Sequence, residues 1–260
     1  MTKKSRKNTL KFEKTQEAKL ALVTGGARRV GAAIVQKLHD RGYKVIIHCH
    51  QSLQEAQLLA KGLNTQRTNS VFVVQKELLD PRAAEDIMTA VNDWAGRLDL
   101  LVNNASLFLR TEMTSFSSPD WNALFDIHVK IPFLLSLAAR PLLAKQSGSI
   151  INVTDIHAEN PLKGYSAYCQ SKAALEMQTK SLAREFAPEI RVNAIAPGAI
   201  IWPENSNTLT PEIQEKIITK IPLKKHGNPE YIAQAILALA ENPYITGQIL
   251  KVDGGRSILS

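Results

Sequence analysis

Short apolar runs rich in β-branched residues alternate with longer helix-forming stretches along almost the whole chain of 260 residues. This alternation is typical of βαβ units, in which parallel strands are joined by helices. The expected strands are 20–24, 44–48, 71–75, 99–103, 149–154, 191–196 and 248–252. The expected helices are 29–41, 53–63, 82–95, 120–145, 166–187 and 229–240. No repeat or linker divides them, so the pattern predicts one α/β domain with a seven-stranded, doubly wound parallel sheet and helices on both faces.

The positive charge of the chain is concentrated at its N-terminus. The formal net charge is +8, and the pI is about 9.4, which would suit a nucleic-acid partner. Residues 1–19 hold seven Lys or Arg and two Glu, a net charge of +5, so the remaining 241 residues carry only +3. We therefore expect a disordered, solvated basic arm at 1–17 and one folded domain at 18–260. An arm that touches RNA or a membrane is the alternative, and a nucleic-acid partner is not expected.

Targeting and metal-binding signals are weak in this sequence. No apolar segment follows the N-terminal charges as it would in a secretory signal, and no uninterrupted apolar run approaches the roughly 20 residues that span a bilayer. Cys49 and Cys169 have no metal-binding or redox spacing. We expect a cytoplasmic protein with no membrane span and no metal ion.

Three polar side chains near the fifth expected strand have the chemistry of a proton-transfer site. Tyr168 and Lys172 are four residues apart on an expected helix, so both lie on one face. A nearby ammonium favours the phenolate, and we therefore expect Lys172 to lower the pKa of Tyr168 towards the working range. Asp155 follows the strand at its carboxyl end, where ligands collect in open α/β sheets. Alone, a Tyr and a Lys at this spacing would be ordinary surface residues.

The turn after the first strand has the features of a phosphate-binding turn. Gly25 follows the strand, and Gly31 lies just inside the next helix, where backbone can approach a pyrophosphate at the positive end of the helix dipole. Arg28 and Arg29, followed by Val30, lie between the two glycines. Arginines beside a nucleotide phosphate indicate additional negative charge that needs a partner.

Four motifs occur in the order found in one known family: Thr24-Gly-Gly-Ala-Arg-Arg-Val-Gly31, Asn103-Asn-Ala-Ser106, Tyr168-x-x-x-Lys172 and Pro197-Gly198. Together they resemble the short-chain dehydrogenase/reductase family over about residues 19–256, and their details are similar to pteridine reductases. The resemblance implies a Rossmann-type fold, a dinucleotide cofactor, and Asp155, Tyr168 and Lys172 as the catalytic residues.

The end of the second strand indicates which dinucleotide binds. Enzymes that prefer NAD have an acid there for the ribose 2′-hydroxyl, whereas this chain has His48, His50, Gln51 and Ser52 and no carboxylate until Glu55. We therefore expect NADPH. Pteridine reductases commonly have Arg at the place of Gln51. The two histidines could also form a metal pair, but no third ligand is evident nearby.

The resemblance implies further contacts on both sides of the reaction centre. The implied cofactor-binding residues are Gly25, Arg28, Arg29, Val30, Gly31, His48, His50, Gln51, Ser52, Glu77, Leu78, Asn104, Ala105, Ser106, Tyr168, Lys172, Pro197 and Gly198. The implied substrate-binding residues are Arg29, Ser106, Phe108, Asp155, Tyr168 and Trp202. Phe108 would stack on a flat pterin ring, although it could equally be an ordinary core residue.

Two positions depart from the commoner family pattern. Asp155 replaces a serine, as in pteridine reductases, and a carboxyl group suits a ring whose nitrogens gain protons; a turn cap is the other interpretation. His128 replaces an asparagine that assists a proton relay, and it either takes that role or packs locally. Residues 199–211 have few local structure signals and are a candidate lid over the substrate.

These observations predict an NADPH-dependent pteridine reductase acting on a small-molecule pterin. A 3-oxoacyl-thioester reductase of the same family is the nearest alternative, and a non-catalytic NADP sensor is another. Dihydrobiopterin, dihydromonapterin and dihydrofolate are not distinguished. Helices 120–145 and 166–187 have apolar residues on more than one face, and the family pairs these helices between subunits, so we expect a homotetramer.

Overall fold

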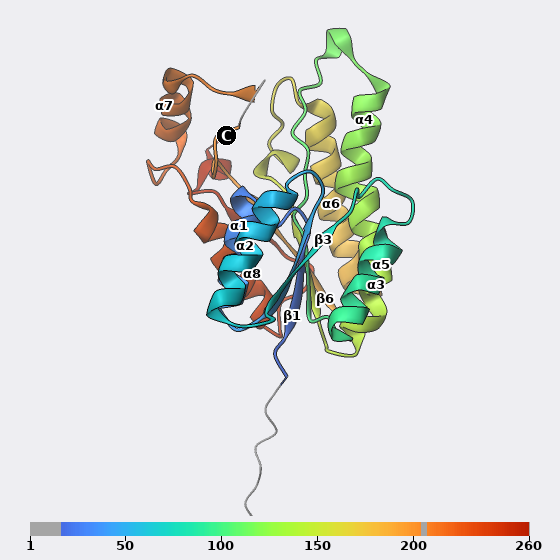
Figure 1. The fold of residues 1–260 in the computed structure, drawn as a ribbon. Coiled ribbons are helices and arrows are strands. Elements are labelled where there is room, and N and C mark those ends of the chain that lie inside the picture. The colour runs from blue at the N-terminus through green and yellow to red at the C-terminus, as the bar shows by residue number, and fades with distance from the viewer. Residues whose placement is uncertain (1–16, 204–206, 260) are drawn as a thin grey trace, which may run out of the picture.

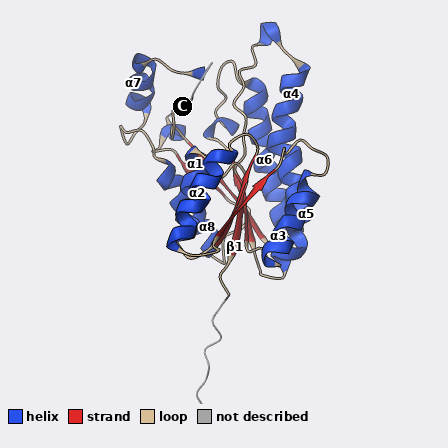
Figure 2. Ribbon diagram, viewed as in Figure 1, coloured by secondary structure: helices blue, strands red, loops and turns tan. Residues whose placement is uncertain are grey.

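The computed structural model describes residues 17–203 and 207–259. Seven strands form one parallel sheet with helices on both faces, as predicted (Figure 1, Figure 2). The strands are β1 (Leu20–Val23), β2 (Lys44–Cys49), β3 (Val71–Gln75), β4 (Leu100–Asn103), β5 (Ser149–Val153), β6 (Arg191–Pro197) and β7 (Ile249–Val252). The predicted arm at 1–17 lies outside the described residues, except for its last residue.

Eight α-helices are found among the described residues. They are α1 (Arg29–Asp40), α2 (Leu53–Gln66), α3 (Ala83–Ala95), α4 (Ser118–Phe125), α5 (Ile131–Ala144), α6 (Ser166–Glu185), α7 (Pro211–Lys220) and α8 (Pro229–Glu241). A π-helical turn, Asp126–Lys130, joins α4 to α5. The helix expected at 120–145 is therefore one continuous helix with a wider turn in its middle.

The sheet order is β3-β2-β1-β4-β5-β6-β7. The chain builds outward from β1 to β3 and then continues from β4 on the other side of β1. Because the connections leave β1 and β4 in opposite directions, a crevice opens at the carboxyl ends of these two strands. The fold thus places the candidate ligand site between the ends of β1 and β4.

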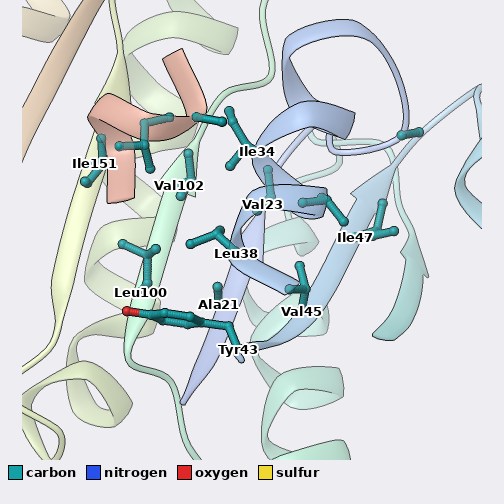
Figure 3. Close-up of a cluster of buried hydrophobic side chains, with 14 of the residues drawn as sticks. Ala21, Val23, Ile34, Leu38, Tyr43, Val45, Ile47, Leu100, Val102 and Ile151 are labelled. Atoms are coloured by element: carbon teal, nitrogen blue, oxygen red, sulfur yellow. The ribbon is translucent and has the colours of Figure 1, made fainter. Parts of the chain in front are cut away.

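Alternate residues of β1 face two separate cores. Ala21 and Val23 pack in the core beneath α1, α2 and α8, part of which Figure 3 shows. Leu20 and Leu22 pack in the core beneath α3, α5 and α6. All four are fully buried, as expected for a parallel sheet covered on both faces.

The continuous helix Ser118–Ala144 is the one described helix that is long and apolar enough to cross a membrane, and 44% of its apolar window is buried in the fold. Its second half, α5, packs on α3 and on strands β4 and β5. Core helices of globular domains pass the same test, so this is weak evidence for a membrane span.

Candidate active site

Tyr168 and Asp155 meet at the carboxyl edge of the sheet. Asp155 follows β5, and Tyr168 lies in the first turn of α6. The Tyr168 hydroxyl donates a 2.8 Å hydrogen bond to Asp155 Oδ2, and the backbone N–H of His157 donates to Asp155 Oδ1 at 2.8 Å. Asp155 therefore satisfies both interpretations of the sequence, because it caps the short turn Ile156–Ala158 and also contacts the phenol.

Lys172 lies one helical turn after Tyr168 and is 2% exposed. Its ammonium group donates a 2.9 Å hydrogen bond to the carbonyl oxygen of Val153 and lies 5.7 Å from the centroid of the Tyr168 ring. Burial lowers the pKa of Lys172 to about 8, although the charge of Asp155 acts in the opposite direction. The structure thus brings together all three predicted catalytic residues.

The acidity of Tyr168 differs from the expectation. Burial raises the pKa of Tyr168 well above its usual value, and the charge and hydrogen bond of Asp155 raise it further. The prediction that Lys172 lowers this pKa is wrong in this structure, because burial and the carboxylate dominate. Tyr168 is therefore a protonated phenol at neutral pH, which is the form that can donate a proton.

His128 lies in the π-helical turn and is 1% exposed. Its Nδ1 lies 2.8 Å from Ser171 Oγ, its Nε2 lies 2.8 Å from Ser106 Oγ, and its ring packs against the edge of Tyr168 at a centroid distance of 5.5 Å. Burial lowers the pKa of His128 to about 2, and the charge of Lys172 acts in the same direction. The imidazole is therefore neutral and lies between two serine hydroxyls, and its place in a proton relay stays a prediction.

The glycine turn after β1 is tightly packed. Gly25 has a φ of +61°, and a Cβ added to Gly31 would lie 2.0 Å from the carbonyl oxygen of Gly25. Both positions therefore require glycine. The side-chain amide of Asn104, after β4, donates to the carbonyl oxygens of Thr24 at 2.9 Å and Gly25 at 3.1 Å. The Thr24 hydroxyl in turn accepts from the backbone N–H groups of Asn104 and Ala105 at 2.9 and 3.0 Å.

His48 is buried beneath this turn and does not face a nucleotide. The backbone N–H of Gly25 donates to His48 Nδ1 at 3.3 Å, and His48 Nε2 lies 2.9 Å from the carbonyl oxygen of Lys76. Since a carbonyl only accepts, Nε2 carries the ring proton; burial lowers the pKa of His48 to about 4. The prediction of a cofactor contact through its side chain is wrong, because both nitrogens hold backbone groups and 2% of the residue is exposed.

The residues after β2 and β3 form the expected edge of the crevice. His50 Nδ1 lies 2.9 Å from Glu77 Oε2, and both side chains are about half exposed. Gln51 is exposed, and Ser52 is half-buried. Leu78 is 4% exposed and packs in the core, so that only its backbone can face a ligand. Among the described residues, no three His, Cys, Asp or Glu side chains gather as metal ligands.

Arg28 and Arg29 occupy the start of α1, where Val30 packs against the core. Arg28 lies 3.7 Å from Glu55. Arg29 has a φ of +54°, a left-handed conformation that favours glycine. Its Nη2 donates a 2.9 Å hydrogen bond to the carbonyl oxygen of Trp202. Arg29 thus connects the glycine turn with the segment after β6.

The turn after β6 is close to the last strand. The backbone N–H of Gly198 donates to the carbonyl oxygen of Val252 at 3.1 Å, and a Cβ on Gly198 would lie 2.7 Å from the Cα of Asp253. Glycine after Pro197 therefore allows this close approach. Trp202, further along, packs on His226 with ring centroids 4.3 Å apart.

Phe108 lies beside Tyr168, as the resemblance implies. Its ring meets the edge of Tyr168 at 4.9 Å and stacks on Tyr165 at 4.4 Å. The Tyr165 hydroxyl donates to Asn207 Oδ1 at 2.7 Å, and Asn207 Nδ2 donates to the carbonyl oxygen of Phe108 at 3.0 Å. Because Tyr165 covers one face, a flat ligand has to stack on the other face of Phe108 or displace Tyr165.

Several known proteins are similar in sequence to this chain over nearly its whole length. Residues 25–257 match the family model described as enoyl-(acyl carrier protein) reductase. Pteridine reductase 1 from Leishmania tarentolae is 33% identical, over 93% of this chain and 97% of its own. The 3-oxoacyl-[acyl-carrier-protein] reductase FabG from Staphylococcus aureus is 33% identical, over 91% and 97%. The chain belongs to the short-chain dehydrogenase/reductase family.

A solved structure agrees with this assignment. FolM alternative dihydrofolate reductase 1 from Brucella canis, in complex with NADP, is 35% identical and covers 92% of this chain and 94% of its own, with a TM-score of 0.86. This short-chain reductase is therefore an oxidoreductase. Sequence reasoning did not place Thr24, Tyr165, Ser171 or Asn207 in the site. Thr24 lies inside the first motif, and its hydroxyl group could have indicated its place in the site.

Proposed function

We propose that this short-chain reductase uses NADPH to reduce the ring of a dihydropterin or of dihydrofolate. The observation that carries the proposal is the carboxylate of Asp155, 2.8 Å from the Tyr168 hydroxyl; the family resemblance implies that a serine is commoner at this position. The similarity to pteridine reductase 1 and to the FolM alternative dihydrofolate reductase supports the same substrate class.

The crevice fits NADP(H). Gly25 and Gly31 leave room for backbone to approach a pyrophosphate at the start of α1, where backbone N–H groups and the helix dipole favour an anion. Arg28 adds a positive charge there, and the nearest carboxylate after β2, Glu55, lies beside it. The FolM structures from Brucella canis and Brucella suis both contain NADP. When bound, the reduced nicotinamide supplies a hydride to the substrate ring.

Residues of the protein supply the proton that accompanies the hydride. A ring nitrogen beside the reduced carbon has to gain a proton, and Tyr168 is held as a protonated phenol by burial and by Asp155. Asp155 Oδ2, hydrogen-bonded to that phenol, can exchange a proton with it. Lys172 keeps its ammonium group against the Val153 carbonyl, close to the Tyr168 ring. Phe108, at the edge of Tyr168, provides a flat surface for the substrate.

Carbonyl reduction is the second candidate, because FabG and a granaticin ketoacyl reductase from Streptomyces violaceoruber, 32% identical over 94% of this chain, are also relatives. A serine hydroxyl donates to a ketone oxygen, whereas an ionised carboxylate at the same place repels it. This favours a ring that carries N–H groups over a ketone.

A substrate panel tests the proposal. NADPH consumption is followed with dihydrobiopterin, dihydromonapterin, dihydrofolate and an acetoacetyl thioester, and NADPH and NADH are titrated separately by fluorescence. We expect turnover of at least one pterin, slow or no turnover of the thioester, and much tighter binding of NADPH. Turnover of the thioester alone would replace the pterin proposal with carbonyl reduction, and equal binding of both nucleotides would contradict the cofactor preference.

We also propose a homotetramer built on α5 and α6. Within one chain, α5 buries Leu135 and Leu143, while other apolar side chains of α5 are exposed, as is Met177 of α6. These exposed residues are Phe133 (41%), Leu134 (36%), Leu137 (42%) and Met177 (61%). A helix face of this composition is expected to be covered by another subunit. The cytoplasmic location expected from the sequence stays a prediction.

A further inference from the structure

The buried imidazole of His128 contacts the hydroxyl group of Ser106, which the family resemblance implies is a substrate-binding residue. His128 is 1% exposed, whereas Ser106, which it contacts, is exposed. The direction of the hydrogen bonds around the ring decides what the Ser106 hydroxyl can offer to a ligand, because a hydroxyl has one proton to donate and lone pairs with which to accept.

The backbone determines the direction of these bonds. The N–H of Leu107 can only donate, and it lies 3.3 Å from His128 Nε2, so Nε2 has no proton. In the neutral ring Nδ1 then carries the proton and donates to Ser171 Oγ at 2.8 Å. The Ser171 hydroxyl in turn donates a hydrogen bond to the carbonyl oxygen of Tyr168 at 2.7 Å, within α6. Every bond in this chain therefore has one direction.

Ser106 is constrained by the same argument. Its Oγ lies 2.8 Å from the unprotonated Nε2, so the hydroxyl group donates its only hydrogen to the ring. The lone pair of Nε2 thus accepts from both the Ser106 hydroxyl and the Leu107 N–H. The other acceptor near this hydroxyl, the carbonyl oxygen of Leu107, is 3.5 Å away and is the weaker partner. What remains on the exposed side of Ser106 is a pair of acceptor lone pairs. An asparagine at position 128 could present either an N–H group or an oxygen, and would not impose this direction.

We propose that His128 is a positioning residue that fixes Ser106 as a hydrogen-bond acceptor, so that the site selects ring substrates with an amino group over rings with a carbonyl oxygen at the same place. The proposal rests on the proposed function and adds to it the residue that sets this selectivity. Burial of the ring, which lowers the pKa of His128 to about 2, keeps the imidazole neutral and the direction constant across the pH range of the enzyme.

The test compares two ring ligands that differ in one group. Dissociation constants of a pterin (2-amino) and of lumazine (2-oxo) are measured with the full chain saturated with NADP⁺, for the wild type, His128→Phe, His128→Gln and Ser106→Ala. One neutral hydrogen bond changes affinity by roughly tenfold or less. We expect the wild type to prefer pterin by about that factor. The preference should disappear in His128→Phe and Ser106→Ala. It should be smaller in His128→Gln than in the wild type, because a side-chain amide can present either an oxygen or an N–H group to Ser106.

If His128 has only a structural role, its substitution should weaken the binding of both ligands equally and leave the ratio of their dissociation constants unchanged. That result would overturn the proposal. Should His128→Phe not fold, as judged by circular dichroism, ¹⁵N spectra of the wild-type imidazole decide the matter. A neutral ring protonated at Nδ1 supports the proposal, and protonation at Nε2 overturns it. If the wild type binds neither ring, the proposed function fails, whereas the nitrogen spectra still report on His128.

Discussion

At the scale of single residues, the pair Asp155–Tyr168 connects the structure to the chemistry. The two side chains share a 2.8 Å hydrogen bond, and Asp155 is held in place by the backbone N–H of His157. A serine hydroxyl at position 155 could orient a carbonyl group but would be a poor acid. The substitution of Asp155 by Ser therefore removes a group that can exchange protons with Tyr168, and it also removes the carboxylate that contributes to the raised pKa of the phenol.

We predict that Asp155→Ser lowers pterin turnover by about 10²–10⁴-fold, the usual contribution of general acid catalysis, with NADPH affinity unchanged. Tyr168→Phe should lose at least as much, because it removes the phenolic proton. In the double variant the two losses should not multiply if the groups act as one unit. Steady-state turnover and fluorescence titration of NADPH measure these effects. Full pterin turnover by Asp155→Ser would remove the main support for the proposed function.

The lowered pKa of Lys172 predicts that the stability of the protein depends on pH. Its pKa is lowered from 10.5 to about 8 in the folded protein, so between these values the unfolded chain binds more protons. Stability from this group therefore rises with pH across this window. Relative to Lys172→Met, the wild type should gain about 2 kcal/mol in the free energy of unfolding between pH 8 and pH 10.

Urea unfolding at several pH values measures this difference, with Lys180→Met, at an exposed position of the same helix, as the control. Above pH 10 the raised pKa of Tyr168 acts in the opposite direction, because the unfolded chain loses the phenolic proton first. Parallel curves for the wild type and Lys172→Met between pH 8 and pH 10 would show that the ammonium group is not buried as described.

Residue types and spacing revealed the catalytic trio, but not the surroundings of each group. The position of His48 on β2 was clear from the sequence, whereas its burial beneath the glycine turn depends on how β1 and β3 pack against it. The sign of the pKa shift of Tyr168 likewise depends on burial, which spacing does not report. Tyr165 and Asn207 are 42 residues apart and meet only in the folded chain.

At the scale of secondary-structure elements, the strands were the most predictable part of the fold. Buried parallel strands are continuous apolar runs, and all seven were found within one or two residues of their expected ends. Helix α7 was not predicted, because its residues lie beside a segment with few local signals. Pro211 at its first turn and Glu212 beside it are ordinary helix-start signals and could have indicated it.

The junction of β1 and α1 gives a prediction about packing. Gly31→Ala places a Cβ 2.0 Å from a backbone oxygen, and we expect it to lower the free energy of unfolding by about 1–3 kcal/mol and to weaken NADPH binding. Gly62→Ala is the matched control, since that glycine lies in α2 with nothing within 4 Å of the added Cβ. It should raise stability by roughly 0.5–1 kcal/mol. Equal effects of the two substitutions in thermal unfolding would contradict the described turn.

At the scale of the whole molecule, the exposed apolar face of α5 predicts assembly. Light scattering at micromolar concentration should give about four times the chain mass of 28.7 kDa. Leu137→Asp, on this face, should reduce the mass, because a carboxylate would be buried between subunits. Leu58→Asp changes a leucine that is 71% exposed on α2 and should leave the mass unchanged. A monomeric wild type would contradict the proposed tetramer.

Hydrogen bonds that involve Thr24, Asn104 and His48 hold the glycine turn after β1 in place. Its chain entropy is therefore lost when the protein folds, and a nucleotide that binds there has little left to order. A larger share of the binding energy then appears as affinity for the folded state than if the turn had to be ordered on binding. By mass action, a ligand held only by the folded state shifts the unfolding equilibrium in proportion to the logarithm of its concentration. The melting temperature of this reductase should consequently keep rising with the nucleotide concentration, even after the site is full.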